Sequence, residues 1–97
     1  MKSITPQELK DWIAQHKKFT LIDVREVFER NTFHIGGEHI PVGEVLARRE
    51  ELHKDEPVIL YCEKGIRSGI VIQRLEALGF QNLYNLSGGM SAWKIAL

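Results

Sequence analysis

The sequence has one cysteine, no long apolar run and no excess of charge of either sign, and each of these absences limits what the protein can be. Cys62 has no partner for an internal disulfide, which is typical of proteins from reducing compartments. The 13 Lys and Arg residues balance 13 Asp and Glu residues, which argues against binding nucleic acids or membrane surfaces through bulk charge. No stretch approaches the about 20 apolar residues of a membrane span, and residues 1–6 lack the apolar region of a signal peptide. We therefore expect a cytoplasmic location, no nucleic-acid partner and no membrane partner.

His16, His39 and His53 also lack the spacing of a metal site, either with one another or with Cys62. The fourth histidine, His34, could act as an acid or base, but a hydrogen-bonded structural histidine is the simpler interpretation. The length of 97 residues predicts a single domain over residues 1–97.

Short apolar strands alternate with helical segments along the whole chain, which predicts a parallel sheet covered by helices on both faces. At the first helix, Thr5 and Glu8 can form a capping box, and its buried side is expected at Leu9, Trp12 and Ile13. The strands are expected at residues 19–24, within 34–41, at 58–61 and at 82–84. The remaining helices are expected at residues 27–30, from 42, at 67–78 and at 90–97.

The central stretch places Cys62 between the strand at residues 58–61 and the helix at 67–78. Gly79 and Phe80 are placed to end this helix in a Schellman turn. A loop between a strand and a helix presents backbone N–H groups without intrahelical partners, and the helix dipole there favours negative charge. The buried positions expected on the helix are Val71, Leu75 and Leu78.

Cys62 is therefore a candidate nucleophile, although a lone cysteine after an apolar strand is more often a buried, inert side chain. Three features favour the reactive interpretation: Cys62 ends the strand, Gly65 allows a tight turn, and Arg67 stands at the start of the helix. Lys64 and Arg67 favour the thiolate form over the thiol, and Glu63 opposes them. We predict a thiolate held by backbone donors and suited to nucleophilic attack.

Arg67 is expected to anchor an anionic substrate or the loop itself, because a guanidinium group suits oxyanions. For Lys64, substrate steering and a solvated loop tip stay equally open, and Ser68 is expected to be the N-cap of the helix. Asp23 and Arg25 are expected to form an internal ion pair with a structural role. Gly88 and Gly89 are expected to let the backbone pass close to the loop.

The chain resembles a single rhodanese domain over nearly its whole length. The motifs that carry the resemblance are LIDVRE at residues 21–26, HIGG at 34–37 with Ile40-Pro41, CEKGIRS at 62–68, and LSGG at 86–89 with Trp93. The resemblance implies a three-layer α/β/α sandwich around a five-stranded parallel sheet. It also implies sulfur transfer, in which Cys62 takes a sulfane sulfur from a donor such as thiosulfate and passes the sulfur on to cyanide or a thiol.

By the same resemblance, the loop residues bind the substrate and no metal or organic cofactor is needed. These loop residues are Glu63, Lys64, Gly65, Ile66, Arg67 and Ser68, and the residues expected to support the site are Asp23, Arg25, His34, Gly88 and Gly89. Three alternatives stay open: a persulfide carrier between protein donors and acceptors, a cysteine phosphatase, and a binding module with a vestigial site. The phosphatase is disfavoured because four residues, not five, separate Cys62 from Arg67.

Overall fold

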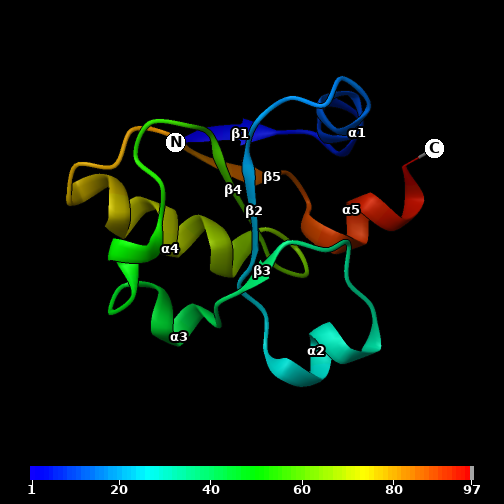
Figure 1. Ribbon diagram of the computed structural model, residues 1–97. Coiled ribbons are helices and arrows are strands. Elements are labelled where there is room, and N and C mark those ends of the chain that lie inside the picture. The colour runs from blue at the N-terminus through cyan, green and yellow to red at the C-terminus, as the bar shows by residue number, and fades with distance from the viewer. Residues whose placement is uncertain (97) are drawn as a thin grey trace.

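The computed structural model describes residues 1–96 and contains a five-stranded sheet in which all neighbouring strands are parallel, in the order β1-β5-β4-β2-β3 (Figure 1). The strands are β1 (Lys2–Ile4), β2 (Thr20–Asp23), β3 (Glu38–His39), β4 (Val58–Tyr61) and β5 (Leu83–Leu86). This architecture confirms the predicted α/β fold class.

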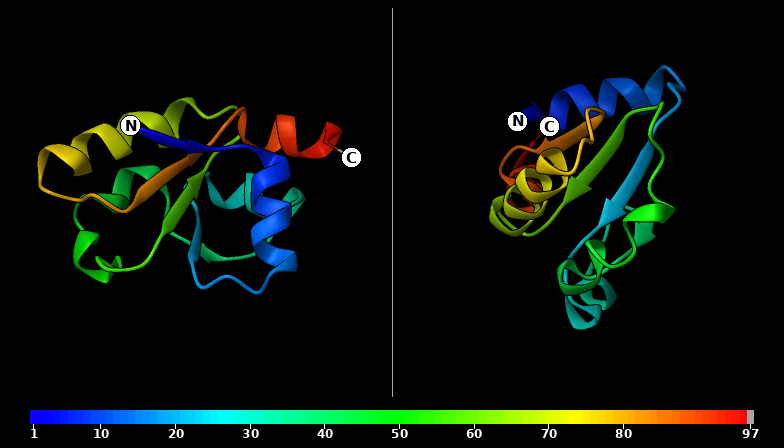
Figure 2. Two further views of the ribbon diagram at one scale, coloured as in Figure 1. Left: turned by 90° about the horizontal axis from the view of Figure 1, so that it is seen from above. Right: turned by 90° about the vertical axis from the view of Figure 1, so that its left-hand side faces the viewer.

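Helices cover both faces of the sheet (Figure 1 and Figure 2). Buried side chains of α1 and α5 pack with those of β4 and β5 on one face, and buried side chains of α3 and α4 pack on the other. The result is a three-layer sandwich. The helical segments are α1 (Pro6–Ala14), α2 (Val27–Thr32), α3 (Val42–Val45), η1 (Arg49–Glu51), α4 (Ile66–Ala77) and α5 (Gly89–Ile95). The predicted closing helix extended to Leu97, which lies outside the described residues.

Strand β4 is buried on both faces and sets the direction of Cys62. Side chains alternate along a strand, so residues 58, 60 and 62 share one face and residues 59 and 61 share the other. Val58, Leu60 and Cys62 accordingly belong to the core under α3 and α4, while Ile59 and Tyr61 belong to the core under α1 and α5. The alternation turns the sulfur toward the layer of α4, the helix that follows it.

Both helix ends with clear local signals form as predicted. In α1, Thr5 Oγ1 accepts a hydrogen bond from Glu8 N at 3.1 Å, and Thr5 N donates to Glu8 Oε1 at 2.9 Å. After α4, Gly79 takes a φ of +100°. Its N–H donates to Glu76 O, and Phe80 N donates to Leu75 O at 3.2 Å, which is the Schellman pattern.

Three details of the predicted strands and buried positions are wrong. Strand β1 was not predicted, because a three-residue edge strand with one buried side chain, Ile4, carries no periodic signal. Leu78 is 56% exposed, because it caps the end of α4, where the chain turns away from the sheet. Ile13 is exposed as well, and α1 buries Leu9. On α4 the buried stripe instead consists of Ser68, Gly69, Val71, Ile72 and Leu75.

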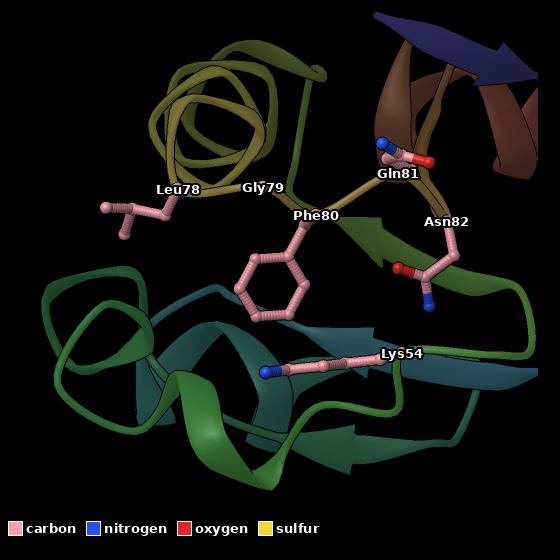
Figure 3. Close-up of a pocket in the computed structure, with 6 residues that line it drawn as sticks. All are labelled: Lys54, Leu78, Gly79, Phe80, Gln81 and Asn82. Atoms are coloured by element: carbon pink, nitrogen blue, oxygen red, sulfur yellow. The ribbon is translucent and has the colours of Figure 1, made fainter.

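The two ends of the strands in the sheet carry different residues. At the carboxyl edge, Asp23 pairs in register with Tyr61, so Cys62 follows directly beside the end of β2. At the opposite edge, the turn from α4 to β5 lines a pocket with Lys54 (Figure 3). That pocket lies at the far end of α4 from Cys62, and its lining contains no cysteine, serine or threonine. Within residues 1–96, no helix is long and apolar enough to cross a membrane.

Candidate active site

Cys62 lines a pocket at the carboxyl end of the central strands. The residue is 1% exposed, yet it lines this pocket together with Glu29, Glu63, Lys64, Ile66 and Arg67. Two backbone N–H groups point at the sulfur, from Gly65 at 3.1 Å and from Ser68 at 3.4 Å. Because both are donors, they stabilise a negative charge on sulfur. Cys62 is thus buried in the core beneath α4, lines the pocket and has two backbone donors directed at its sulfur.

A left-handed glycine shapes the loop around this sulfur. Gly65 has a φ of +88° and is the N-cap of α4, which begins at Ile66. Ser68 is therefore the third helical residue, and the prediction that it caps the helix is wrong. A donor in the first turn of a helix has no intrahelical partner, which leaves the Ser68 N–H available to Cys62.

Asn85 on β5 links two residues of the loop through hydrogen bonds. Its Nδ2 donates to Gly65 O at 2.9 Å, and its Oδ1 accepts from Ser68 Oγ at 2.6 Å. Asn85 and Ser68 are both buried, and buried polar groups that satisfy one another specify a single arrangement. The two bonds fix the positions of the N-cap and the first turn of α4, which donate to the sulfur.

These bonds also decide the direction of the Ser68 hydroxyl. Because Asn85 Nδ2 is used by Gly65 O, the atom facing Ser68 is the acceptor Oδ1, and Ser68 gives it its single proton. Ser68 Oγ, 3.2 Å from Cys62 Sγ, is then left to accept a hydrogen bond from the thiol. The sulfur thus has one acceptor beside it, Ser68 Oγ, and two donors directed at it, the amides of Gly65 and Ser68.

Gly89 allows the start of α5 to lie directly against the loop. It has a φ of +58°, and a Cβ atom there would be 2.3 Å from Cys62 O. Met90 N donates to Cys62 O at 3.0 Å and Ser91 N donates to Glu63 O at 2.9 Å. The neighbouring Gly88, with a φ of +71°, caps α5. Both predicted glycines thus lie at the contact between α5 and the loop.

The expected ion pair between Asp23 and Arg25 is present and buried. Arg25 Nε lies 3.0 Å from Asp23 Oδ1, and Nη2 lies 3.1 Å from Oδ2. Arg25 also donates to Phe33 O at 2.6 Å, and its own carbonyl lies 2.7 Å from His39 Nε2. Burial alone would raise the pKa of Asp23, but the hydrogen bonds and charge of Arg25, aided by Arg30, hold this pKa below its ordinary value.

Glu63 lies near two cations, Arg25 after β2 and Lys94 of α5. Its Oε1 lies 3.3 Å from Arg25 Nη1, and its Oε2 lies 3.2 Å from Ser91 Oγ and 4.0 Å from Lys94 Nζ. The negative charge of Glu63 is therefore balanced within the protein, although the residue follows the cysteine directly in the chain.

Arg67 forms a bidentate ion pair with Glu29 of α2. Nη1 donates to Oε1 at 2.7 Å, and Nη2 donates to Oε2 at 2.8 Å. The hydrogen bonds from Arg67 lower the pKa of Glu29 to about 2, and those to Glu29 raise the pKa of Arg67. Both groups are charged at neutral pH. The arginine expected to anchor an anion is thus occupied by a carboxylate of the protein.

The other predicted residues lie at the surface. Lys64 and Ile66 are exposed at the mouth of the pocket. His34 is exposed, and its Nδ1 accepts a hydrogen bond from Gly36 N at 2.9 Å within its own turn. The structure does not bring His34 to the sulfur. The described part of the chain has no cluster of three or more metal-ligating side chains.

Comparison with known proteins identifies the family. The rhodanese-like domain family matches residues 5–96. The chain belongs to this family. This rhodanese-like domain is similar to the crystal structure of a "Rhodanese-like Domain Protein" from Staphylococcus aureus. The two share 35% sequence identity with a TM-score of 0.88, covering 96% of this chain and 91% of the other.

Two curated relatives have a similar extent. YqhL of Bacillus subtilis, named as an uncharacterized protein, is 40% identical over 96% of this chain and 72% of its own length. The thiosulfate sulfurtransferase GlpE of Coxiella burnetii is 32% identical over 89% of this chain and 82% of its own. This rhodanese-like domain therefore has sulfurtransferase homologues that match most of its length.

Three residues that shape the site of this rhodanese-like domain were not singled out from the sequence: Glu29, His39 and Asn85. Each acts through a partner far away in the chain, as Asn85 does with Ser68 across 17 positions and Glu29 with Arg67 across 38. One signal was available for Asn85, because an amide side chain in a short buried strand requires a partner.

Proposed function

We propose that this protein is a sulfurtransferase in which Cys62 carries a sulfane sulfur as a persulfide. The proposal is supported above all by Cys62, which lines a pocket and whose sulfur has the N–H donors of Gly65 and Ser68 directed at it. Small donors such as thiosulfate and acceptors such as cyanide or a thiol fit this chemistry. A reducing compartment such as the cytoplasm would keep the thiol available.

The proposed reaction has two balanced steps. The Cys62 thiolate attacks the outer sulfur of thiosulfate, S₂O₃²⁻, a sulfur–sulfur bond forms at Cys62, and sulfite, SO₃²⁻, leaves with the electron pair of the broken bond. The persulfide anion, Cys62–S–S⁻, then gives its outer sulfur to cyanide, and thiocyanate leaves while the thiolate returns. This is covalent ping-pong catalysis, and it requires neither a metal nor an organic cofactor.

Thiosulfate is expected to add one sulfur to the intact protein, an increase of about 32 Da, because the first step leaves a covalent persulfide. Cyanide should remove the added mass and release one equivalent of thiocyanate. Intact-mass spectrometry before and after each reagent measures both steps. An unchanged mass with thiosulfate and with a small organic persulfide would contradict the proposed function.

A second function, transfer between Cys62 and a protein donor or acceptor, is favoured by the surface around the pocket. Phe28 of α2 is 71% exposed and Ile66 at the pocket mouth is 67% exposed, and Val27 and Ile70 are exposed as well. Exposed apolar groups beside a reactive site are typical of protein-binding surfaces. A carrier of this kind would be saturated by thiosulfate only at high concentration, which the KM for thiosulfate measures.

A further inference from the structure

The pocket above Cys62 offers little net charge to a substrate. Its charged lining residues are two acids, Glu29 and Glu63, and two bases, Lys64 and Arg67. Glu63 contacts Arg25, which also pairs with Asp23, and Lys94 of α5. The charge that a donor meets near Arg67 therefore depends on whether Arg67 interacts with Glu29 or with the donor.

Glu29 occupies the terminal fork of Arg67, formed by Nη1 and Nη2. The two N–O distances of 2.7 and 2.8 Å show a bidentate pair, the arrangement in which a guanidinium group binds a carboxylate most strongly. An anionic donor that used this terminal fork of Arg67 would have to replace a carboxylate that is already in place. The low pKa of Glu29, about 2, keeps that carboxylate charged throughout the neutral range.

The carboxylate of Glu29 is also fixed at its own helix. Glu29 is the third residue of α2, and Oε1 accepts a hydrogen bond from Glu26 N at 3.0 Å. This bond belongs to the cap of α2 and limits the freedom of the side chain to turn away from Arg67. The position of the negative charge at the pocket is thus set by the helix start.

On the basis of the proposed function, we propose that Glu29 sets which charge of sulfur donor the site accepts. By holding Arg67, Glu29 disfavours dianionic donors such as thiosulfate. Donors with a single charge, such as the persulfide of a small thiol, are disfavoured less. Glu29 is then a specificity-determining residue that acts through Arg67 and through its own charge, without itself touching the transferred sulfur.

The substitution Glu29→Gln tests this inference. Glutamine keeps the size and the acceptor for Glu26 N, because Gln serves at this position of a capping box, but it removes the charge and the bidentate bond. The donors are thiosulfate and methanethiosulfonate, CH₃SO₂S⁻, which presents the same outer sulfur with one negative charge fewer. Initial rates of thiocyanate formation give kcat/KM for each donor, and in ping-pong kinetics this value reports the donor step alone.

We expect kcat/KM to rise about tenfold for thiosulfate and about threefold for methanethiosulfonate, because the Coulomb energy of the removed charge scales with the charge of the donor. The double variant Glu29→Gln with Arg67→Ala should lose most of the gain with thiosulfate. Glu44→Gln is the matched control, since it removes a carboxylate paired with Arg48 on the surface, and it should change neither value.

The possible failures are distinguishable. Equal factors for the two donors, or no change with either, in a protein whose wild type transfers sulfur would overturn the role of Glu29 and leave the proposed function intact. A wild type that takes sulfur from neither donor would overturn the proposed function, and this inference with it. Because α2 buries none of its side chains, the variant is expected to fold, which circular dichroism checks.

Discussion

Replacing Cys62 by serine is expected to reduce sulfur transfer at least about a thousandfold, because no other group can take its place as the nucleophile. A serine hydroxyl does not ionise near neutral pH, and its oxygen forms no persulfide. Thiocyanate formation from thiosulfate and cyanide measures the loss, and the increase of about 32 Da in intact mass should disappear with it.

The same substitution should leave the fold intact, which separates a chemical role of Cys62 from a structural one. The serine oxygen can still accept from Gly65 N and Ser68 N, which donate to the sulfur in the native protein. A melting temperature close to that of the wild type is therefore the control. Transfer above background by the folded variant would contradict the assignment of Cys62 as the nucleophile.

The parts of the fold that the sequence predicted are those with local signals. The capping residues Thr5 and Glu8 and the glycine that ends α4 act on neighbours within five positions, so their chemistry can be read directly from the chain. Leu78 was misplaced because helical periodicity extends past the residue where the helix ends. Strand β1 was missed because an edge strand depends on its neighbour, here β5, for its definition.

The candidate site divides in the same way. Cys62, Gly65 and Arg67 stand within six residues of one another, and the strand–loop–helix pattern predicts their place together. The sequence pattern predicted that Arg67 anchors an anionic substrate, but in the structure Arg67 forms an ion pair with Glu29. No local rule could assign this partner, since it comes from another helix and is brought to Arg67 only by the fold.

Removal of the Arg25 charge by Arg25→Met is expected to lower the free energy of unfolding by about 3–5 kcal/mol, because it leaves a buried carboxylate without its main partner. Arg25 is 2% exposed and Asp23 is fully buried, so water cannot replace the lost hydrogen bonds. Arg30 lies 3.4 Å from Asp23 Oδ2 and compensates only in part. Urea denaturation at pH 7 measures the loss.

The matched control is Arg48→Met, which removes an arginine that is also paired with two carboxylates, Glu44 and Glu51, but at the surface. Exposed pairs contribute about 0–1 kcal/mol, so this variant should unfold close to the wild type. Equal losses in the two variants would contradict the argument from burial.

The pKa of Asp23 is lowered in the folded protein. The stability that its charge provides is therefore present above the unfolded pKa and is lost as the pH falls through the folded pKa. The difference between Arg25→Met and the wild type should therefore shrink in acid.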